Sequence, residues 1–364
     1  MKFSAKITLW YEDNKRDLPW RKTSDPYRVW LSEIILQQTR IDQGTDYYLR
    51  FVESFPDVAS LAAAGEERIL KHWQGLGYYS RARNLFKTAS IIAGKYNGKF
   101  PDTYEEIIKL PGIGTYTAAA ILSIAFQKPY PVVDGNVYRV ISRLFGMREP
   151  IDSGKGKKVI HQKMQELMGG ADPGTYNQAV MEFGAMHCTP MNPGCTACIF
   201  KAECVALASG EVENFPVRKP RPVQRYRYFN YFLFLIRGND SVKIMINKRK
   251  GNDIWKNLYD FPLIETETKQ SLRKLQAMVE AAMNLKNKTL RIMGNEYKHI
   301  LSHQVIMARF IQVEMTEKEL STIQKNLRFE DLIPIEIRDL AQYPVPRLID
   351  KFLEENRLDE SSGE

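Results

Sequence analysis

The sequence of 364 residues contains only four cysteines, and all four lie between positions 188 and 204. This argues against a disulfide-stabilised secreted protein. Long hydrophobic runs are absent as well, since the longest candidate, residues 231–236, has only the length of a strand. Residues 1–17 carry dispersed charges and no apolar stretch typical of a secretory signal. We therefore expect a cytoplasmic protein with no membrane partner.

Acidic residues are the minority charge. The 52 lysines and arginines outnumber the 43 aspartates and glutamates, which gives a net charge of +9. An excess of positive charge suits a polyanionic partner such as nucleic acid. The length predicts two or three domains, and the hydrophobic content of 44% predicts packed cores.

The most informative stretch is residues 110–120, Leu-Pro-Gly-Ile-Gly-Thr-Tyr-Thr-Ala-Ala-Ala. Pro111, Gly112 and Gly114 interrupt an apolar segment and the alanines restart a helix, so the pattern predicts helix, tight turn, helix. The unpaired amides and the dipole at the start of a helix form a site for phosphate. An ordinary helix hairpin is the alternative. Asp134, which follows in a Gly-Asn turn, favours a functional site.

Glu33 is the unusual residue of an earlier helix. Asp25 and Pro26 form a strong helix start, and the residues after them are apolar almost all round, which predicts a buried helix. Three of the four residues one turn away from Glu33 are apolar. Poor solvation raises the pKa of a glutamate toward neutrality, as a general acid requires. The alternative is a side chain that reaches the helix edge and pairs with an arginine.

Residues 73–84 place two glycines, two tyrosines and two arginines in one turn. Glycine permits close backbone approach, an aromatic ring can wedge into a base stack, and arginines meet phosphates. A structural turn with core tyrosines is the alternative.

The four cysteines are separated by six, two and five residues: Cys188, Cys195, Cys198 and Cys204. Clustered thiols in a cytosolic protein favour a metal site, and ligand identity alone permits either a structural zinc or an iron–sulfur cluster.

The pattern changes after residue 214. Residues 215–228 contain five basic residues, three prolines and no acid, which predicts an extended connector lying along a nucleic acid backbone. The periodicity then predicts a strand hairpin (231–236 and 242–247, around 238–240), an amphipathic helix (271–283), short strands between 290 and 313, a closing helix (347–355) and a disordered tail (359–364).

Residues 110–137 resemble the helix-hairpin-helix and Gly/Pro…Asp element of the DNA glycosylase superfamily. With residues 30–39, residues 75–79 and the cysteine loop, nearly the whole chain is similar to the adenine DNA glycosylase (MutY) family of the helix-hairpin-helix/endonuclease III superfamily. The cysteine spacing is that of this superfamily's [4Fe–4S] loop.

The resemblance implies a multidomain α and α+β protein. An all-helical helix-hairpin-helix glycosylase domain with the [4Fe–4S] loop (188–204) would span residues 1–214, followed by the basic linker 215–228. Residues 229–358 resemble a Nudix-like α/β domain, here expected to recognise the lesion. The helix after Pro262 lacks the glutamates that hold Mg²⁺ in Nudix hydrolases, so this domain should bind and not hydrolyse.

The implied activity is monofunctional removal of adenine mispaired with 8-oxoguanine or guanine in double-stranded DNA, by a monomer, as the first step of base excision repair. By resemblance, Glu33 would protonate adenine N7 and Asp134 would stabilise the oxocarbenium-like sugar, with Tyr116 and Asn136 positioning Asp134 and the sugar. We expect Glu33 among apolar neighbours and Asp134 in a polar turn to differ in protonation. Endonuclease III has a lysine at the position of Tyr116, and a tyrosine cannot form a Schiff base.

The remaining assignments also follow from the resemblance. They comprise an adenine pocket (Trp20, Arg21, Gln178, Glu182), a lesion-side group (Gln38, Thr39, Leu76, Tyr78, Leu301, Ser302, His303), hairpin phosphate contacts (Gly112, Gly114) and the cluster ligands (Cys188, Cys195, Cys198, Cys204). Core packing is the alternative for Trp20, and backbone bonding at a strand end is the alternative for Ser302 and His303. Leu301 replaces an aromatic residue of the family. A non-catalytic DNA-binding relative is the competing function, but such a protein would need neither Glu33 nor Asp134.

Overall fold

The computed structural model of the protein describes residues 1–220, 224–237, 242–283, 288–301, 303–316, 319, 332–356 and 358. Packing divides the chain into two compact units. The first unit comprises Met1–Gly65 and Asn84–Arg221, and the second comprises Glu66–Arg83 and Pro222–Glu364.

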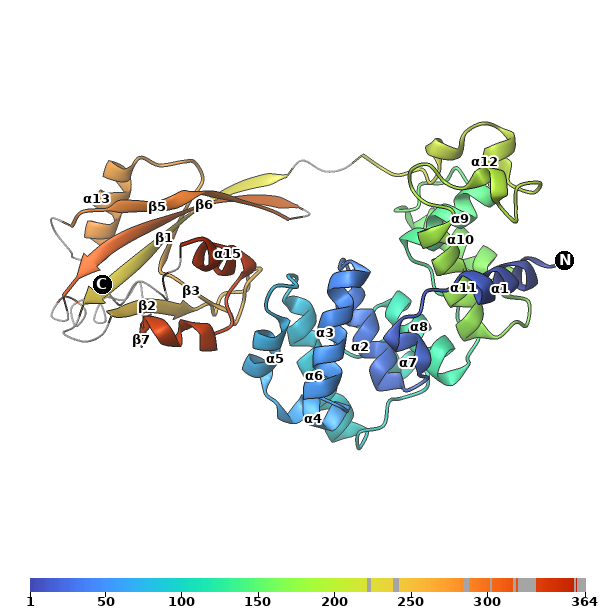
Figure 1. The fold of residues 1–364 in the computed structure, drawn as a ribbon, viewed down its shortest axis with the longest axis horizontal. Coiled ribbons are helices and arrows are strands. Elements are labelled where there is room, and N and C mark those ends of the chain that lie inside the picture. The colour runs from blue at the N-terminus through green and yellow to red at the C-terminus, as the bar shows by residue number, and fades with distance from the viewer. Residues whose placement is uncertain are drawn as a thin grey trace. The chain divides into compact units, whose positions relative to one another are not determined.

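The first unit is helical, as expected from the sequence (Figure 1). Its helices are α1 (Phe3–Asn14), α2 (Pro26–Leu36), α3 (Ile41–Ser54), α4 (Val58–Ala63), most of α6 (Ser80–Lys95), α7 (Tyr104–Ile107), α8 (Thr115–Phe126), α9 (Gly135–Phe145), α10 (Gly154–Met168), α11 (Pro173–Met186) and α12 (Val205–Ala208), with short 3₁₀ turns at Pro19–Lys22, Cys195–Ala197 and Val212–Asn214. Among the described helices, none combines the length and the apolar composition needed to cross a bilayer.

Side-chain caps fix several helix starts. The Asp25 carboxylate accepts a hydrogen bond from the Tyr27 amide at 3.1 Å, and Pro26 occupies the first turn of α2, as the sequence predicts. Asp134 caps α9 in the same way, because its Oδ1 accepts from the Val137 amide at 2.8 Å. This cap fixes the start of the helix and, with it, the direction of the Asp134 carboxylate.

The hairpin between α7 and α8 has the predicted helix, turn, helix form. Gly112 has a φ of +76°, and a Cβ there would lie 2.6 Å from the Asn84 Cβ. Both the backbone conformation and the close packing therefore require glycine at this position. Thr88 anchors the turn by donating to the Pro111 carbonyl at 2.8 Å. Gly114 precedes the first amides of α8, which a helix leaves without internal partners.

Within the described residues, the second unit is built on one mixed sheet of seven strands, with a central order β3-β2-β1-β6-β5 in which β1 and β6 are parallel. Its elements are α5 (Glu66–Trp73), β1 (Arg225–Arg237), β2 (Val242–Lys248), β3 (Tyr259–Asp260), β4 (Leu263–Thr266), α13 (Leu272–Met283), β5 (Arg291–Ile300), β6 (Gln304–Met315), β7 (Leu332–Glu336), a 3₁₀ helix (Ile337–Gln342) and α15 (Arg347–Asn356). The predicted Nudix-like α/β architecture is confirmed.

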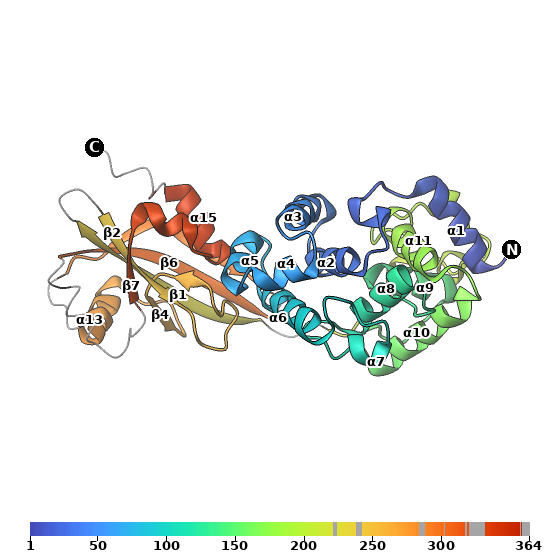
Figure 2. The same ribbon diagram turned by 90° about the horizontal axis from the view of Figure 1, so that it is seen from below.

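Helices cover both faces of this sheet (Figure 2). On one face, Leu275 and Val279 of α13 pack into a cluster with Ile311. On the other face, Phe352 of α15 stacks on Phe310 with ring centroids 3.7 Å apart. Because neighbouring residues of a strand point to opposite faces, β6 serves both cores.

Residues 66–83 belong by packing to the second unit, although the sequence boundary at 214 places them in the glycosylase domain. Gln74 donates to Asp350 Oδ1 at 2.7 Å, and the Tyr79 hydroxyl donates to the Val345 carbonyl at 3.0 Å. These contacts join residues far apart in sequence, which local patterns do not report.

The start of the connector 215–228 is attached to the first unit, and its end forms the first residues of β1. The Ile151 amide donates to the Val217 carbonyl at 3.0 Å, which attaches the start of the connector to the first unit. At its other end, β1 already begins at Arg225. The expected hairpin turn 238–240 and the expected disordered tail 359–364 lie outside the described residues.

Candidate active site

A cavity of about 260 Å³ in the first unit brings together all eight residues predicted for catalysis and for the adenine pocket. Its lining comes from five helices (α2, α3, α8, α9 and α11), the Pro19–Lys22 turn and neighbouring loops, and includes Arg16, Trp20, Arg21, Glu33, Thr39, Tyr116, Asp134, Asn136, Gln178, Met181 and Glu182. This volume lies near the lower end of the range for small-molecule sites, roughly 300 Å³. A neighbouring cavity of about 580 Å³ contains neither Glu33 nor Asp134.

Glu33 projects from α2 into this cavity. Burial raises its pKa from 4.5 to about 7, and the negative charge of Asp134 adds to the rise. A hydrogen bond from Tyr116 and the charge of Arg21 act in the opposite direction. The Glu33 carboxyl is therefore close to half protonated at neutral pH, as the apolar neighbours in the sequence predict.

Asp134 is held on both carboxylate oxygens. Oδ1 accepts from the Val137 amide at 2.8 Å, and Oδ2 accepts from Asn136 Nδ2 at 2.7 Å. Burial raises the pKa of Asp134, while these donors and the Arg139 charge oppose the rise. The turn is therefore less solvated than the sequence indicates, and the hydrogen bonds provide the polar surroundings.

Asn136 is itself fixed by Arg139, whose Nη2 donates to Asn136 Oδ1 at 2.8 Å and to the Gly184 carbonyl at 2.6 Å. A Cβ on Gly184 would lie 2.6 Å from the Asn136 Cβ. The close approach of α9 and α11 at this glycine thus sets the position of the amide that holds Asp134.

Glu182 on α11 is 1% exposed and accepts hydrogen bonds from two arginines. Arg16 Nη2 lies 2.6 Å and Arg21 Nη2 lies 2.8 Å from Glu182 Oε2. Burial alone would raise the pKa of Glu182, but the hydrogen bonds from both arginines outweigh it and hold the pKa at about 2. Glu182 therefore stays ionised and holds the guanidinium groups of Arg16 and Arg21 at the cavity.

Gln178 and Trp20 also line the cavity: Gln178 Oε1 accepts from the Tyr11 hydroxyl at 2.7 Å, and the Trp20 ring meets the Tyr48 ring edge-on with centroids 5.5 Å apart. Arg16 and Tyr11 were not predicted from the sequence. They lie more than 160 residues from their partners, and no local motif marks them.

Two residues predicted to enter DNA have left-handed backbones without being glycine. Gln38 in the first unit has a φ of +59° and is exposed. Tyr78 in the second unit has a φ of +48° and is 46% exposed. Such conformations cost of order 1–3 kcal/mol and cluster at functional sites. By contrast, Leu76 is buried, and Thr39 lines the cavity.

The loop predicted to read the lesion is the tip of the hairpin between β5 and β6 in the second unit. The Leu301 amide donates to the Gln304 carbonyl at 2.8 Å, and the Arg225 amide donates to the His303 carbonyl at 3.2 Å. The His303 side chain is exposed. Ser302 lies outside the described residues.

The four cysteines are free thiols, each partly exposed. Burial raises the pKa of Cys198 to about 11. A hydrogen bond from the Phe200 amide opposes this rise, and the charges of the other three cysteines add to it, so the sulfurs influence one another. Arg143 Nη1 lies 3.5 Å from Cys188 Sγ, and the Phe200 amide lies 3.4 Å from Cys198 Sγ. Within the described part of the chain, no three His, Cys, Asp or Glu side chains converge as ligands of a single ion.

Two family models match the chain. Residues 31–169 match the HhH-GPD superfamily of base excision DNA repair proteins, and residues 232–355 match the NUDIX domain. An adenine DNA glycosylase of Buchnera aphidicola subsp. Acyrthosiphon pisum is 34% identical over 309 residues, which cover 84% of this chain and 84% of that protein.

Solved structures resemble the first unit. A thermostable thymine-DNA glycosylase aligns with a TM-score of 0.53 and 29% identity over 57% of this chain and 95% of its own. A trapped endonuclease III–DNA covalent intermediate aligns with a TM-score of 0.50 at 23% identity, over 57% of this chain and 94% of that chain. The second similarity concerns the fold alone.

Proposed function

The chain belongs to the adenine DNA glycosylase family, and from that membership we propose that it excises adenine paired with 8-oxoguanine or guanine by acid-assisted hydrolysis of the N-glycosidic bond. Base excision repair and the removal of adenine follow from the family. The choice of mispair, the mechanism and action as a monomer are our proposals. The observation that carries the mechanism is a cavity in which Glu33, with a pKa of about 7, lies beside Asp134.

Glu33 acts as the general acid. Adenine is a poor leaving group as an anion, and protonation at N7 lets it depart as a neutral base. A carboxyl with a pKa near 7 holds a proton in a large fraction of molecules at neutral pH and releases it readily. Tyr116 fixes the direction of this carboxyl through its hydrogen bond.

Asp134 stabilises the positive charge that develops on the sugar. The Val137 amide and Asn136 favour its ionised form and fix both oxygens before substrate arrives. Because Tyr116 stands where the related lyases have lysine, no Schiff base with the sugar forms, and water completes the hydrolysis.

Adenine is recognised by the polar wall of the cavity. A base inside a duplex must first be flipped out, at a cost of a few kcal/mol. Glu182, through Arg16 and Arg21, supplies charged hydrogen-bond donors at the adenine edge, while Gln178 and Trp20 complete the pocket.

The partner base is read inside the stack. Gln38 and Tyr78 are exposed on their respective units and enter the duplex, with Thr39 and Leu76 beside them. Ser302 and His303 contact the altered edge of 8-oxoguanine, and Leu301 packs against the surroundings of the lesion. Residues 229–358 thus supply the loop that contacts the altered edge, while residues 1–214 carry the excision site and the residues that enter the duplex.

The backbone of the DNA is bound at the hairpin turn, where Gly112 and Gly114 let a phosphate approach the amides of α8. A [4Fe–4S] cluster bound by Cys188, Cys195, Cys198 and Cys204 would cross-link residues 188–204. The donors fit this group, because each cysteine binds a different iron and the sulfurs need not converge on one point. The Arg143 and Phe200 donors suit the sulfurs of such a cluster.

The test is a single-turnover assay on duplexes with adenine opposite 8-oxoguanine, with and without alkali before electrophoresis. Strand breaks seen only after alkali are expected, because base loss without lyase chemistry leaves an intact backbone. Asp134→Asn is the matched control, since asparagine also caps a helix and removes only the charge. Strand breaks without alkali, or full activity of Asp134→Asn, would contradict the mechanism.

A further inference from the structure

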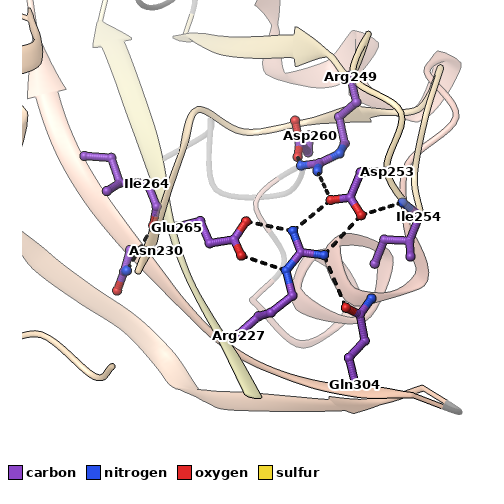
Figure 3. A network of polar contacts seen from close by, with 9 residues as sticks. All are labelled: Arg227, Asn230, Arg249, Asp253, Ile254, Asp260, Ile264, Glu265 and Gln304. Carbon is purple, nitrogen blue, oxygen red and sulfur yellow. Dashed lines mark hydrogen bonds and ion pairs between the residues drawn. The ribbon is translucent and has the colours of Figure 1, made fainter. Parts of the chain in front are cut away.

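A network of charged side chains centred on the largely buried Arg227 lies on one face of the sheet in the second unit (Figure 3). Arg227 on β1 pairs bidentately with Glu265, with both distances 2.7 Å. Its Nη1 and Nη2 also donate to Asp253 at 3.1 and 2.8 Å, and Nη1 donates to Gln304 Oε1 at 3.4 Å. The Arg227 side chain is only 11% exposed. One guanidinium thus connects β1, β4, β6 and the loop 249–258.

Asp253 is the second centre of this network. Its Oδ2 also accepts from Arg249 at 3.0 Å, and its Oδ1 accepts from the Ile254 amide at 2.8 Å. The hydrogen bonds from Arg227 hold the pKa of Asp253 at about 2, so it stays charged. Arg249 in turn pairs with the buried Asp260 at 2.7 Å. The loop 249–258 is therefore fixed to the sheet by charge as well as by packing.

The same loop supports the hairpin that ends at residues 301–303 in two ways, by direct contact with β5 and through Arg227 of β1 on the β6 side. On the β5 side, the Trp255 ring lies 5.7 Å from the His299 ring. On the β6 side, Gln304 accepts from Arg227, which Asp253 holds. Both contacts lie within two residues of the tip.

The hairpin needs such support. β5 is an edge strand of the central order, and its pairing with β6 shifts register between Met293 and Tyr297. Beyond that irregularity only four residue pairs join the two strands before the tip. β6 is also paired with β1 along its length, so near the tip the less supported strand is β5, which has β6 as its one paired neighbour among the described strands.

We propose that Arg227 and Asp253 are positioning residues for lesion recognition: their ion network holds the β5–β6 hairpin so that Leu301 and His303 at its tip meet the base opposite the adenine at a fixed depth. This inference rests on the proposed function, in which that tip reads 8-oxoguanine. Buried ion pairs add little net stability, because desolvation offsets their attraction, whereas bidentate arginine pairs impose a defined geometry.

The chain offers a matched control on the opposite face of the sheet. Arg309 of β6 is 8% exposed, and its Nη2 donates at 2.8 Å to both Asn230 Oδ1 and the Gln270 carbonyl. Arg309→Met therefore removes a buried guanidinium from the same sheet but from the face away from the loop 249–258. Arg227→Met removes the network, and Arg227→Lys keeps a cation without the bidentate geometry.

The experiment measures single-turnover excision of adenine opposite 8-oxoguanine and opposite guanine, and compares the ratio of the two rates. In Arg227→Met we expect the ratio to fall about tenfold, mostly through the 8-oxoguanine duplex. Arg227→Lys should give an intermediate ratio, and Arg309→Met should keep the wild-type ratio. Thermal unfolding of each variant reports any general loss of stability, which would lower both rates together.

A wild-type preference for 8-oxoguanine that survives Arg227→Met, or that falls equally in Arg309→Met, would overturn this inference and leave the proposed function standing. A wild-type protein without any such preference would refute the proposed reading of the lesion, and this inference with it.

Discussion

Replacing Glu33 by glutamine should abolish adenine excision and also stabilise the fold at alkaline pH. Burial raises the pKa of Glu33 from 4.5 to about 7. Below pH 4.5 the carboxyl is protonated in both the folded and the unfolded chain and does not alter their balance. Between pH 4.5 and 7 the unfolded chain releases the proton while the folded chain keeps it, so the free energy of unfolding falls as pH rises.

The size of this effect follows from the shift. At 1.36 kcal/mol per pKa unit, the rise to about 7 corresponds to about 3 kcal/mol, fully present above pH 7. Glutamine does not titrate, so the stability of Glu33→Gln relative to wild type should increase by about this amount between pH 4.5 and 8. Urea unfolding of both proteins at several pH values measures the difference.

Kinetics provides the second readout. Excision at subsaturating DNA should fall roughly tenfold per pH unit above 7, because only the protonated acid is active. Tyr116→Phe removes a hydrogen bond that lowers the pKa of Glu33 and should shift this decline to higher pH. A stability difference independent of pH, together with a rate that does not decline above pH 7, would refute the assignment of Glu33 as the acid.

Three further outcomes are expected. Glu182→Gln should lower the free energy of unfolding by about 3 kcal/mol at pH 7, because it leaves two arginines without their carboxylate. Since the pKa of Glu182 is about 2, the stabilisation by this carboxylate is complete above pH 4.5 and is lost as the pH falls toward 2. Urea unfolding of both proteins at pH 7 and pH 3 would detect the difference. Gly184→Ala should displace Asn136, and should therefore slow excision and lower the free energy of unfolding by about 1–3 kcal/mol. Gly94→Ala is the control: no atom lies within 4 Å of the added Cβ, so this variant should retain full activity and stability in the same assays. Purified wild type should carry about four irons per chain, and Cys198→Ser should lose most of them in elemental analysis; an iron content unchanged by the substitution would contradict the cluster assignment.

Local chemistry could be predicted from the sequence wherever neighbours along the chain decide it. Asp25 and Pro26 predict the start of α2, and the apolar residues one helical turn from Glu33 predict the poor solvation of its carboxyl group. The short apolar run 231–236 predicts a strand, and β1 contains it. In each case the deciding contacts span a few residues.

Contacts between distant segments could not be predicted. Arg16 is separated from Glu182 by 166 residues, and nothing near Arg16 indicates a carboxylate partner. Arg227 falls in a basic, proline-rich stretch that favours an exposed connector, yet three acceptors from other parts of the chain surround it in the sheet. Charge composition alone does not separate a solvated arginine from a buried one.

The grouping of residues 66–83 with the second unit affects how this protein can be dissected. A fragment ending near residue 214 would lack the sheet and would also lose contacts made by residues 66–83. The hydroxyl of the buried Tyr79 would lose its bond to the carbonyl of Val345, and Gln74 would lose its bond to Asp350. The turn that carries Tyr78 would lose these anchors. Truncation would therefore disturb both lesion-side elements at once, and point substitutions are needed to tell their contributions apart.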